Sequence, residues 1–183
     1  MGISFETYER VALEDSDEQW ELVCGRLRAK PPMTVAHNDA ELNLYDQLRA
    51  QLDPLLYRVR PNAARLRVST GSFYIPDLVV VSTALHHRNA EQRPYGLELY
   101  EEPMPLVVEV WSPSTGDYDV NTKLREYRLR ADSEIWLVHP YERTVTSWRR
   151  QPDGSYTESV HRDGQIAPAA LPGVRIDLAT LFA

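Results

Sequence analysis

The chain alternates between stretches with a helical period of apolar residues and short apolar runs of strand length. The helical period predicts helices over residues 4–13 and 117–131, and a third from Thr34, its N-cap, to about residue 52. Apolar runs predict strands at 55–59, 64–68, 75–81, 106–111 and 134–138. The last three runs lack polar alternation, which is typical of strands buried on both faces.

Turn residues complete this pattern. They predict a hairpin over 20–29 that turns near Gly25, and a second hairpin that joins 144–149 to 156–161 through Asp153-Gly154. Pro172-Gly173 predicts a turn, after which residues 174–182 form a strand and a short helical piece. Residues 82–104 show no clear period, and we expect a loop there with about one turn of helix.

This order of elements predicts an α/β fold with a mixed sheet flanked by helices, and not a regular βαβ repeat. Neither GxGxxG nor GxxxxGK[ST] occurs, so the sequence does not support a dinucleotide-binding or a P-loop protein. A length of 183 residues without internal repeats fits one domain, and we expect residues 1–183 to form it.

Composition narrows the function classes. At 43% hydrophobic and 26% charged residues the chain is of ordinary globular type, and its net charge of −7 disfavours a protein that coats nucleic acid. The acidic balance is compatible with an enzyme whose active site holds carboxylates and a divalent metal. A single cysteine, Cys24, excludes an intrachain disulfide framework and a zinc–thiolate cluster. No apolar segment is long enough to span a membrane, and the N-terminal residues lack a signal peptide's apolar region, so we expect a cytoplasmic protein.

Glu109 is out of place in the apolar run Leu-Val-Val-Glu-Val-Trp. A buried carboxylate is costly unless it is paired, protonated or bound to metal. Asp77 poses a milder case, since it begins an apolar strand after Pro76. Carboxylates on neighbouring buried strands can converge on one divalent cation such as Mg²⁺. The alternatives are an Asp that caps a loop and a Glu that pairs with a nearby arginine.

Lysine is rare in this chain. Only two of the 20 Lys and Arg residues are lysines, Lys30 and Lys123. Lys123 lies on the predicted helix after Glu109, with Asp119 and Tyr127 one helical turn to either side. A surface pair with Asp119 explains Lys123 without any function. A compact ammonium that approaches a water or a phosphate explains why arginine is not used there.

Six stretches of the chain together carry a family resemblance. They are residues 20–27, 76–81, 105–115, 117–127, 134–138 and 171–178. In this order they resemble the bacterial putative restriction endonuclease family of the PD-(D/E)XK nuclease superfamily. The resemblance implies a restriction-endonuclease-like core, with a mixed β-sheet flanked by helices and additional β-hairpins.

The resemblance also implies a catalytic set. Asp77 and Glu109 match the acidic residues of the motif, as metal ligands. The usual superfamily lysine comes two positions after the acid, where this chain has Trp111, so the standard motif is broken. The family supplies its lysine from the following helix instead, and Lys123 is the match.

Two further residues match the family with less weight. Glu21 matches an N-terminal acid that can join the metal site, and its alternative is a half-buried hairpin residue facing solvent. His37 matches a histidine at the start of the second helix, and its alternative is a polar first-turn residue near Thr34. Cys24 replaces an Asp that the family often has before the hairpin glycine, which affects the turn and not catalysis.

These matches predict a metal-dependent endonuclease that hydrolyses DNA phosphodiester bonds. Asp77, Glu109 and Glu21, with the Val110 carbonyl, are the expected ligands of Mg²⁺ or Mn²⁺. Lys123 is expected to orient water or stabilise charge on the phosphate, and arginines to contact the DNA backbone.

Two alternatives stay open. One is a catalytically silent nuclease-fold dimer that acts as an interaction or regulatory protein, and the weaker one is hydrolysis of a smaller phosphate ester. The resemblance also implies a homodimer. Trp148 and Tyr156 either mark its surface or pack on the sheet.

Overall fold

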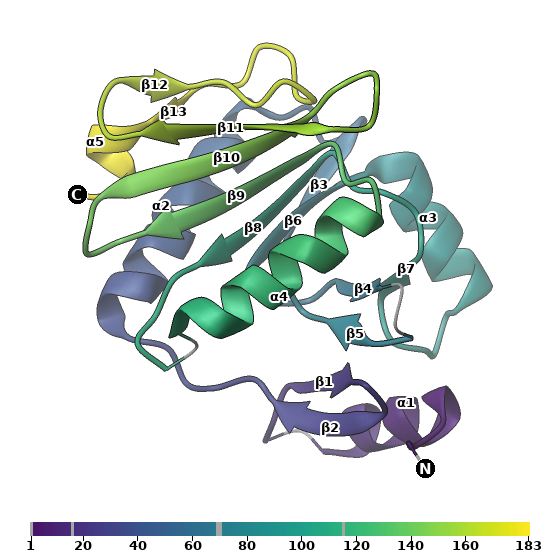
Figure 1. Ribbon diagram of the computed structural model, residues 1–183. Coiled ribbons are helices and arrows are strands. Elements are labelled where there is room, and N and C mark those ends of the chain that lie inside the picture. Colours follow the sequence, from purple (N-terminus) through teal and green to yellow (C-terminus); the bar gives the residue numbers. More distant parts are fainter. Residues whose placement is uncertain (1, 16, 69–70, 115) are drawn as a thin grey trace.

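A six-stranded mixed sheet forms the centre of the protein (Figure 1). The computed structural model describes residues 2–15, 17–68, 71–114 and 116–183. In spatial order the strands are β11 (Tyr156–His161), β10 (Thr144–Arg150), β9 (Glu134–His139), β8 (Leu106–Val110), β6 (Leu78–Ser82) and β3 (Tyr57–Pro61). Only β8 and β9 pair in parallel, and the other neighbours are antiparallel. The predicted mixed α/β architecture is thereby confirmed.

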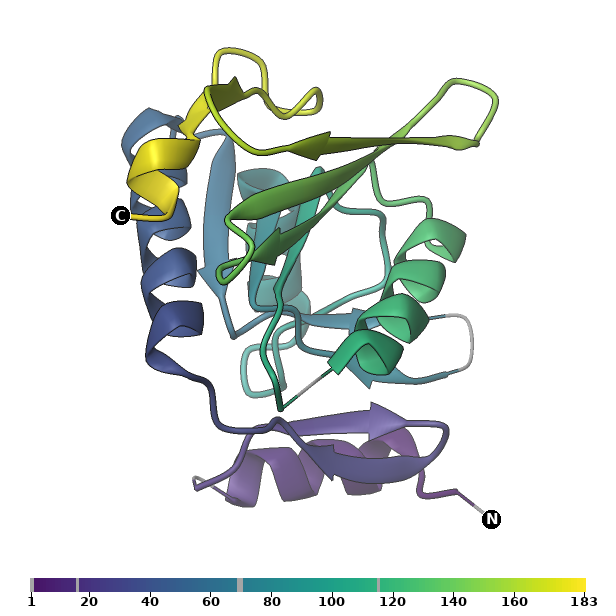
Figure 2. The ribbon, with the colours of Figure 1, turned by 60° about the vertical axis from the view of Figure 1, so that its left-hand side comes forward.

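Helices cover both faces of this sheet (Figure 2). On one face lie α2 (Val35–Gln51) and α5 (Leu178–Leu181), and on the other lies α4 (Gly116–Leu129). The alternation of a strand explains the continuous apolar run of β6. Leu78 and Val80 join the core under α2, whereas Val79 and Val81 join the core on the α4 side. In β8, Val107 faces α4, and Glu109, two residues on, therefore faces the same helix.

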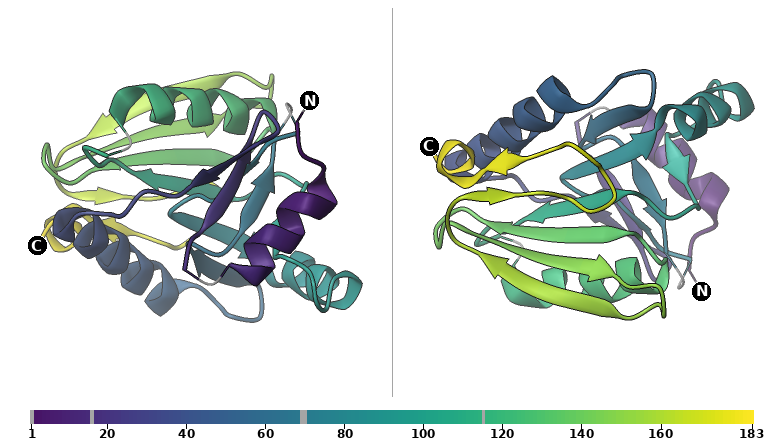
Figure 3. Two further views of the ribbon diagram at one scale, coloured as in Figure 1. Left: turned by 90° about the horizontal axis from the view of Figure 1, so that it is seen from below. Right: turned by 90° about the horizontal axis from the view of Figure 1, so that it is seen from above.

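A smaller five-stranded sheet packs below the central one. Its order is β2 (Arg26–Ala29), β1 (Trp20–Val23), β5 (Phe73–Tyr74), β4 (Arg65–Arg67) and β7 (Leu99–Tyr100). The N-terminal helix α1 (Phe5–Glu14) lies against the hairpin of β1 and β2, as Figure 3 shows from below. Tyr8, Leu22 and Phe73 share the small core between them. The remaining strands, β12 (Gln165–Ile166) and β13 (Ile176–Asp177), pair with each other.

The β1–β2 hairpin turns through two residues with positive φ, as expected for a type I′ turn. Cys24 has φ 48° and Gly25 has φ 75°, and the flanking pair is Val23 with Arg26. This turn sets the register that buries Glu21 on one face of the hairpin.

One predicted segment is wrong. Residues 82–104 contain helix α3 (Thr83–Gln92) and strand β7, in place of a loop with one helical turn. The helix has almost no apolar face, and of its side chains only Thr83 is buried. It therefore carries no hydrophobic period, and its start is marked instead by Ser82, whose hydroxyl accepts from the Leu85 N–H.

The other helices match their predictions within a few residues. Thr34 is the N-cap of α2, and its Oγ1 accepts from the His37 N–H at 3.3 Å. Trp148 and Tyr156 pack within the sheet: Trp148 is buried in the core beneath α4, and the Tyr156 hydroxyl donates to the Asp132 carbonyl at 2.6 Å. Among the described helices, none is both long and apolar enough to cross a membrane.

Candidate active site

Asp77 and Glu109 meet where the strands β6 and β8 lie side by side. Asp77 directly precedes β6, and its Oδ2 accepts a hydrogen bond from the Val110 N–H at 2.6 Å. Both carboxylates are buried, with 2% of Asp77 and 8% of Glu109 exposed. The backbone of β8 thus holds the aspartate, which lies just before β6, next to the glutamate, which lies within β8.

Lys123 joins Glu109 to Glu21. Its Nζ lies 3.3 Å from Glu109 Oε1 and 3.0 Å from Glu21 Oε1. One helical turn further along α4, the Tyr127 hydroxyl donates to Glu109 Oε1 at 2.6 Å. Glu21 is held from the other side by the Ile75 N–H, at 2.8 Å. A helix, the central sheet and the hairpin therefore converge on one buried ammonium.

A second group of polar side chains closes into a ring on the other side of Asp77. Asp77 Oδ2 lies 3.1 Å from His37 Nε2, and Asp77 Oδ1 lies 2.7 Å from Lys30 Nζ. Lys30 donates to Asn62 Oδ1, and Asn62 Nδ2 donates to Glu41 Oε1 at 2.5 Å. The circuit closes where Glu41 Oε2 lies 3.9 Å from His37 Nδ1. Asp77 is thus the member that the ring shares with the Glu109 cluster.

The two carboxylates have opposite proton affinities. Burial raises the pKa of Glu109 to about 7, and the Lys123 ammonium only partly offsets it. Burial also opposes ionisation of Asp77, but Lys30 and His37 outweigh it and hold the Asp77 pKa well below its usual range. Although burial lowers the pKa of His37, its contact with Asp77 raises it above the usual value. The site therefore combines a firmly ionised aspartate with a glutamate that exchanges its proton near neutral pH.

The donor atoms of this site fit a divalent cation. His37, Glu41 and Asp77 each offer a ligand atom, and these atoms lie within 4.8 Å of one another. Asp77 Oδ1 and both ring nitrogens of His37 are buried, and their contacts are charge contacts without good hydrogen-bond geometry: Lys30 Nζ lies 2.7 Å from Oδ1, and Asp77 Oδ2 lies 3.1 Å from Nε2. Carboxylate oxygens that are buried in this way are suitable ligands for a divalent cation.

The five residues expected from the sequence lie in this one region. Glu21 is buried and contacts Lys123, whereas the alternative placed it toward solvent. His37 lies in the first turn of α2 near Thr34, as its alternative also required, and in addition its side chain is 0% exposed and contacts Asp77. Asp119, the alternative partner of Lys123, has its side chain outside the described part of the structure, as does Thr115.

Trp111, at the usual lysine position, stacks on His139, with ring centroids 4.4 Å apart. Its placement agrees with a lysine supplied from α4 and not from the strand. The helix thereby brings the ammonium to Glu109 from above the sheet face.

Four neighbours were not predicted as site residues. They are Lys30, Glu41, Asn62 and Tyr127. Two signals existed: Lys30 is the only lysine besides Lys123, and Glu41 follows His37 by one helical turn. Asn62 carried no signal, because only the pairing of β3 with β6 brings it beside Asp77.

Comparison with known proteins places the chain in a family. The family model described as "Uma2: Putative restriction endonuclease" matches residues 5–179. The chain belongs to the Uma2 family. This Uma2 chain is also similar in fold to a solved structure titled as a putative nuclease belonging to DUF820 from Anabaena variabilis ATCC 29413. The TM-score is 0.74 at 17% identity, over 92% of each chain. None of the curated proteins matches it. The restriction-endonuclease resemblance and the nuclease-like fold are therefore confirmed.

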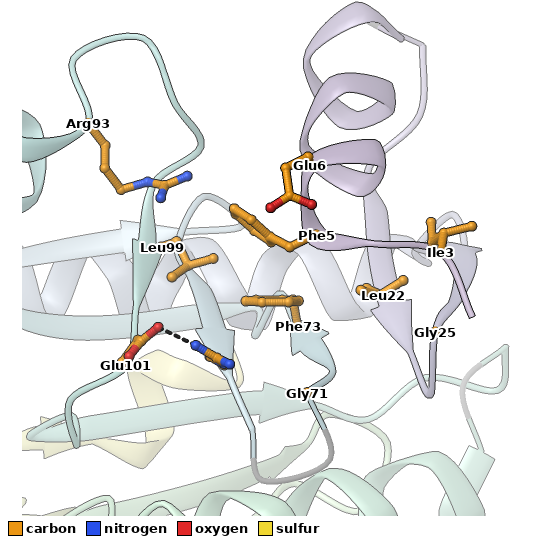
Figure 4. A pocket seen from close by; sticks show the side chains of 11 residues that line it. Ile3, Phe5, Glu6, Leu22, Gly25, Gly71, Phe73, Arg93, Leu99 and Glu101 are labelled. Carbon is orange, nitrogen blue, oxygen red and sulfur yellow. Dashed lines mark hydrogen bonds and ion pairs between the residues drawn. The ribbon is translucent and has the colours of Figure 1, made fainter. Parts of the chain in front are cut away.

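Two hollows of the Uma2 chain lie at different distances from the site. A pocket of about 520 Å³ beside α1 and the small sheet gathers Phe5, Phe73 and Leu99 near the Arg67–Glu101 ion pair (Figure 4). None of the five expected site residues lines this pocket. A groove of about 540 Å³ borders the ring instead, where its lining includes Lys30, Glu41 and Asn62. The ring therefore borders on solvent at this groove, although none of the five expected site residues lines it either.

Proposed function

We propose that this Uma2 chain is a metal-dependent endonuclease that hydrolyses DNA phosphodiester bonds. One observation carries the proposal: Asp77 and Glu109 project side by side from the central sheet, and Lys123 from α4 contacts Glu109. Family membership supports a nuclease of this kind. We propose that residues 1–183 act as one PD-(D/E)XK domain.

The carboxylates would hold Mg²⁺ or Mn²⁺. Asp77, Glu109 and Glu21 supply the hard oxygen donors that these ions prefer, and all three carboxylates are buried. When bound, such a cation polarises a phosphate oxygen and lowers the pKa of a coordinated water. His37 keeps Asp77 ionised and oriented through its 3.1 Å contact.

Lys123 and Glu109 have different roles in the proposed reaction. The Lys123 ammonium sits beside Glu109 and stabilises negative charge that grows on a phosphate bound there. Glu109, with its pKa raised to about 7, exchanges a proton at neutral pH and ionises fully once a cation is near. Tyr127 holds the Glu109 carboxylate in place.

Backbone contacts to DNA would come from exposed arginines. Arg60 and Arg67 are already paired with Glu98 and Glu101, which leaves them less suited to this role. Arg125 lies two residues after Lys123 on α4; it contacts Glu126 at 3.3 Å, but 71% of its side chain is exposed, more than in Arg60 or Arg67. We propose that Arg125 contacts a phosphate of the substrate.

We also propose a homodimer formed through β11. This strand is an edge of the central sheet, and residues 157–160 are exposed along it. An open edge offers unpaired backbone groups to a second copy of the same strand. Light scattering of the purified protein measures the assembly, and a monomer at every concentration would count against it.

A catalytically silent protein is the second candidate. The observation that favours it is that cations already contact the buried carboxylates: Lys123 lies on Glu21 and Glu109, and Lys30 lies on Asp77. Such a site is electrostatically balanced without metal. The net charge of −7 also suits a protein that does not bind DNA tightly.

A plasmid-nicking assay tests the proposal. Wild type and three single variants, Asp77→Asn, Glu109→Gln and Lys123→Met, are compared with Mg²⁺, with Mn²⁺ and with a chelator. Each variant is expected to lose about 100-fold or more of the rate. Glu142→Gln removes an exposed carboxylate on the β9–β10 turn and is the matched control. Nicking that is equal in wild type and Lys123→Met would show that the proposed mechanism is wrong or that the activity belongs to a contaminant.

A further inference from the structure

Both lysines of the chain end at the same pair of carboxylates. Lys123 approaches Glu109 from α4, and Lys30 approaches Asp77 from the end of β2. Arginine supplies the other 18 basic positions. An ammonium is a compact point charge on a flexible stem, so it can move onto and off a carboxylate. The shared use of lysine therefore points to a specific task for Lys30 as well.

The ammonium of Lys30 occupies the one oxygen of Asp77 that is left for a ligand. Oδ2 already accepts from the Val110 N–H and contacts His37. Oδ1 faces Lys30 Nζ at 2.7 Å, and the Lys30 side chain is only 7% exposed. A divalent cation that binds Asp77 through Oδ1 must therefore compete with this ammonium.

We propose that Lys30 is an internal counter-cation that holds the metal position on Asp77 and is displaced when a divalent metal binds. The inference rests on the proposed metal dependence, but not on nuclease activity. Asn62 stays within reach as a hydrogen-bond acceptor for the displaced ammonium. The groove beside the ring, which Lys30 also lines, gives the side chain room to move toward solvent.

The proposal predicts that a mutation in the site raises the affinity for a divalent cation, whereas mutations in a metal site usually lower it. Removing Lys30 leaves Asp77, Glu41 and Glu109 close together with less positive charge among them. Their attraction for a divalent cation then rises, because no ammonium competes for Oδ1. We expect Lys30→Met to bind Mn²⁺ at least about tenfold more tightly than the wild type.

Calorimetric titration of chelator-stripped protein with MnCl₂ at pH 8 tests this. Lys30→Met and Lys30→Gln remove the charge, and Lys30→Arg keeps it. Lys30→Arg is expected to stay within about threefold of the wild type. Arg26→Gln removes an exposed charge at the start of β2, four residues before Lys30, and is the control for long-range electrostatics. Thermal unfolding with and without Mn²⁺ gives an independent readout, because tighter binding produces a larger metal-induced rise in Tm.

The outcomes separate this proposal from the proposed function. The expected result is that both neutral variants bind Mn²⁺ more tightly than the wild type, whereas Lys30→Arg and Arg26→Gln do not. Binding by the neutral variants alone, with none by the wild type, also supports the proposal. If the wild type binds Mn²⁺ and the neutral variants bind it equally or more weakly, the role of Lys30 is wrong and the metal site stands. If Lys30→Arg gains as much as Lys30→Met, charge is not the cause and the proposal also fails. No binding by any variant overturns both. If Lys30→Met does not fold, Lys30→Gln decides, since its amide can still contact Asn62.

Discussion

Glu109 places a carboxyl group in a buried strand, and Glu109→Gln removes its charge with almost no change in volume. In the folded protein, burial raises the Glu109 pKa from its usual 4.5 to about 7. A carboxyl whose pKa is raised on folding stabilises the fold only in its protonated form. That contribution is complete below about pH 4.5, falls as the pH rises, and is gone above about pH 7.

The magnitude follows from the size of this shift. Each pKa unit corresponds to about 1.4 kcal/mol, so a rise from 4.5 to about 7 costs the metal-free protein about 3 kcal/mol of stability across the interval. Glutamine cannot ionise and avoids this loss. The contribution of His37, whose pKa is also raised, is common to both proteins and cancels in their difference.

Urea denaturation of both proteins at pH 5 and pH 8, with a chelator present, measures the effect. Part of the contribution is already lost at pH 5, so between these pH values the wild type is expected to lose about 2–3 kcal/mol more than Glu109→Gln does. Glu142→Gln, at an exposed position, should follow the wild type. Mg²⁺ added at pH 8 is expected to restore stability to the wild type and to Glu142→Gln, but not to Glu109→Gln. Parallel pH dependences for wild type and Glu109→Gln would refute the reasoning.

Two further predictions concern single contacts. Tyr127→Phe removes the 2.6 Å hydrogen bond that favours ionised Glu109, so the Glu109 pKa should rise further and Mn²⁺ affinity at pH 7 should fall severalfold by calorimetry. Tyr156→Phe also loses a buried hydrogen bond, at about 1 kcal/mol, but should leave Mn²⁺ binding unchanged, and equal effects of both variants would contradict the assignment. Cys24→Asn should stabilise the protein by about 0.5–1 kcal/mol in urea denaturation, because asparagine tolerates the positive φ of 48° better. Cys24→Ser, which also removes the thiol, should give no such gain, and an equal gain would show that the turn is not the cause.

The predictions of helices and strands were correct where an element is buried, because burial requires a regular pattern of apolar residues. The run of β6 is apolar throughout because helices or other strands cover both of its faces, and such runs are recognisable without a structure. Helix α3 was not recognised from its sequence, because it lies on the surface and buries little beyond Thr83. Its cap at Ser82 was the only local signal, and one capping residue does not distinguish a helix from a turn.

Some residues of the candidate site were also recognisable from the sequence, and others were not. Asp77 and Glu109 stood out because a charged residue within or beside an apolar strand breaks its pattern. Lys30 and Asn62 lie in connecting segments and Glu41 lies in a helix, where polar residues are ordinary. Their burial arises only when β2, β3 and α2 come together around Asp77.

By itself, the amino-acid sequence determined the mixed α/β fold, the buried acidic pair and the scarcity of lysine. These features depend on residue type and on short-range spacing, which are fully present in the chain. Only the tertiary structure decided the partners of each charge: Lys30 reaches Asp77 across 47 residues, and Lys123 reaches Glu21 across 102. Electrostatic energy depends on distance and on burial, and both are set by elements far apart in the sequence. Lys30 therefore had no assigned role until the fold placed it on Asp77, whereas Lys123 contacts Glu109.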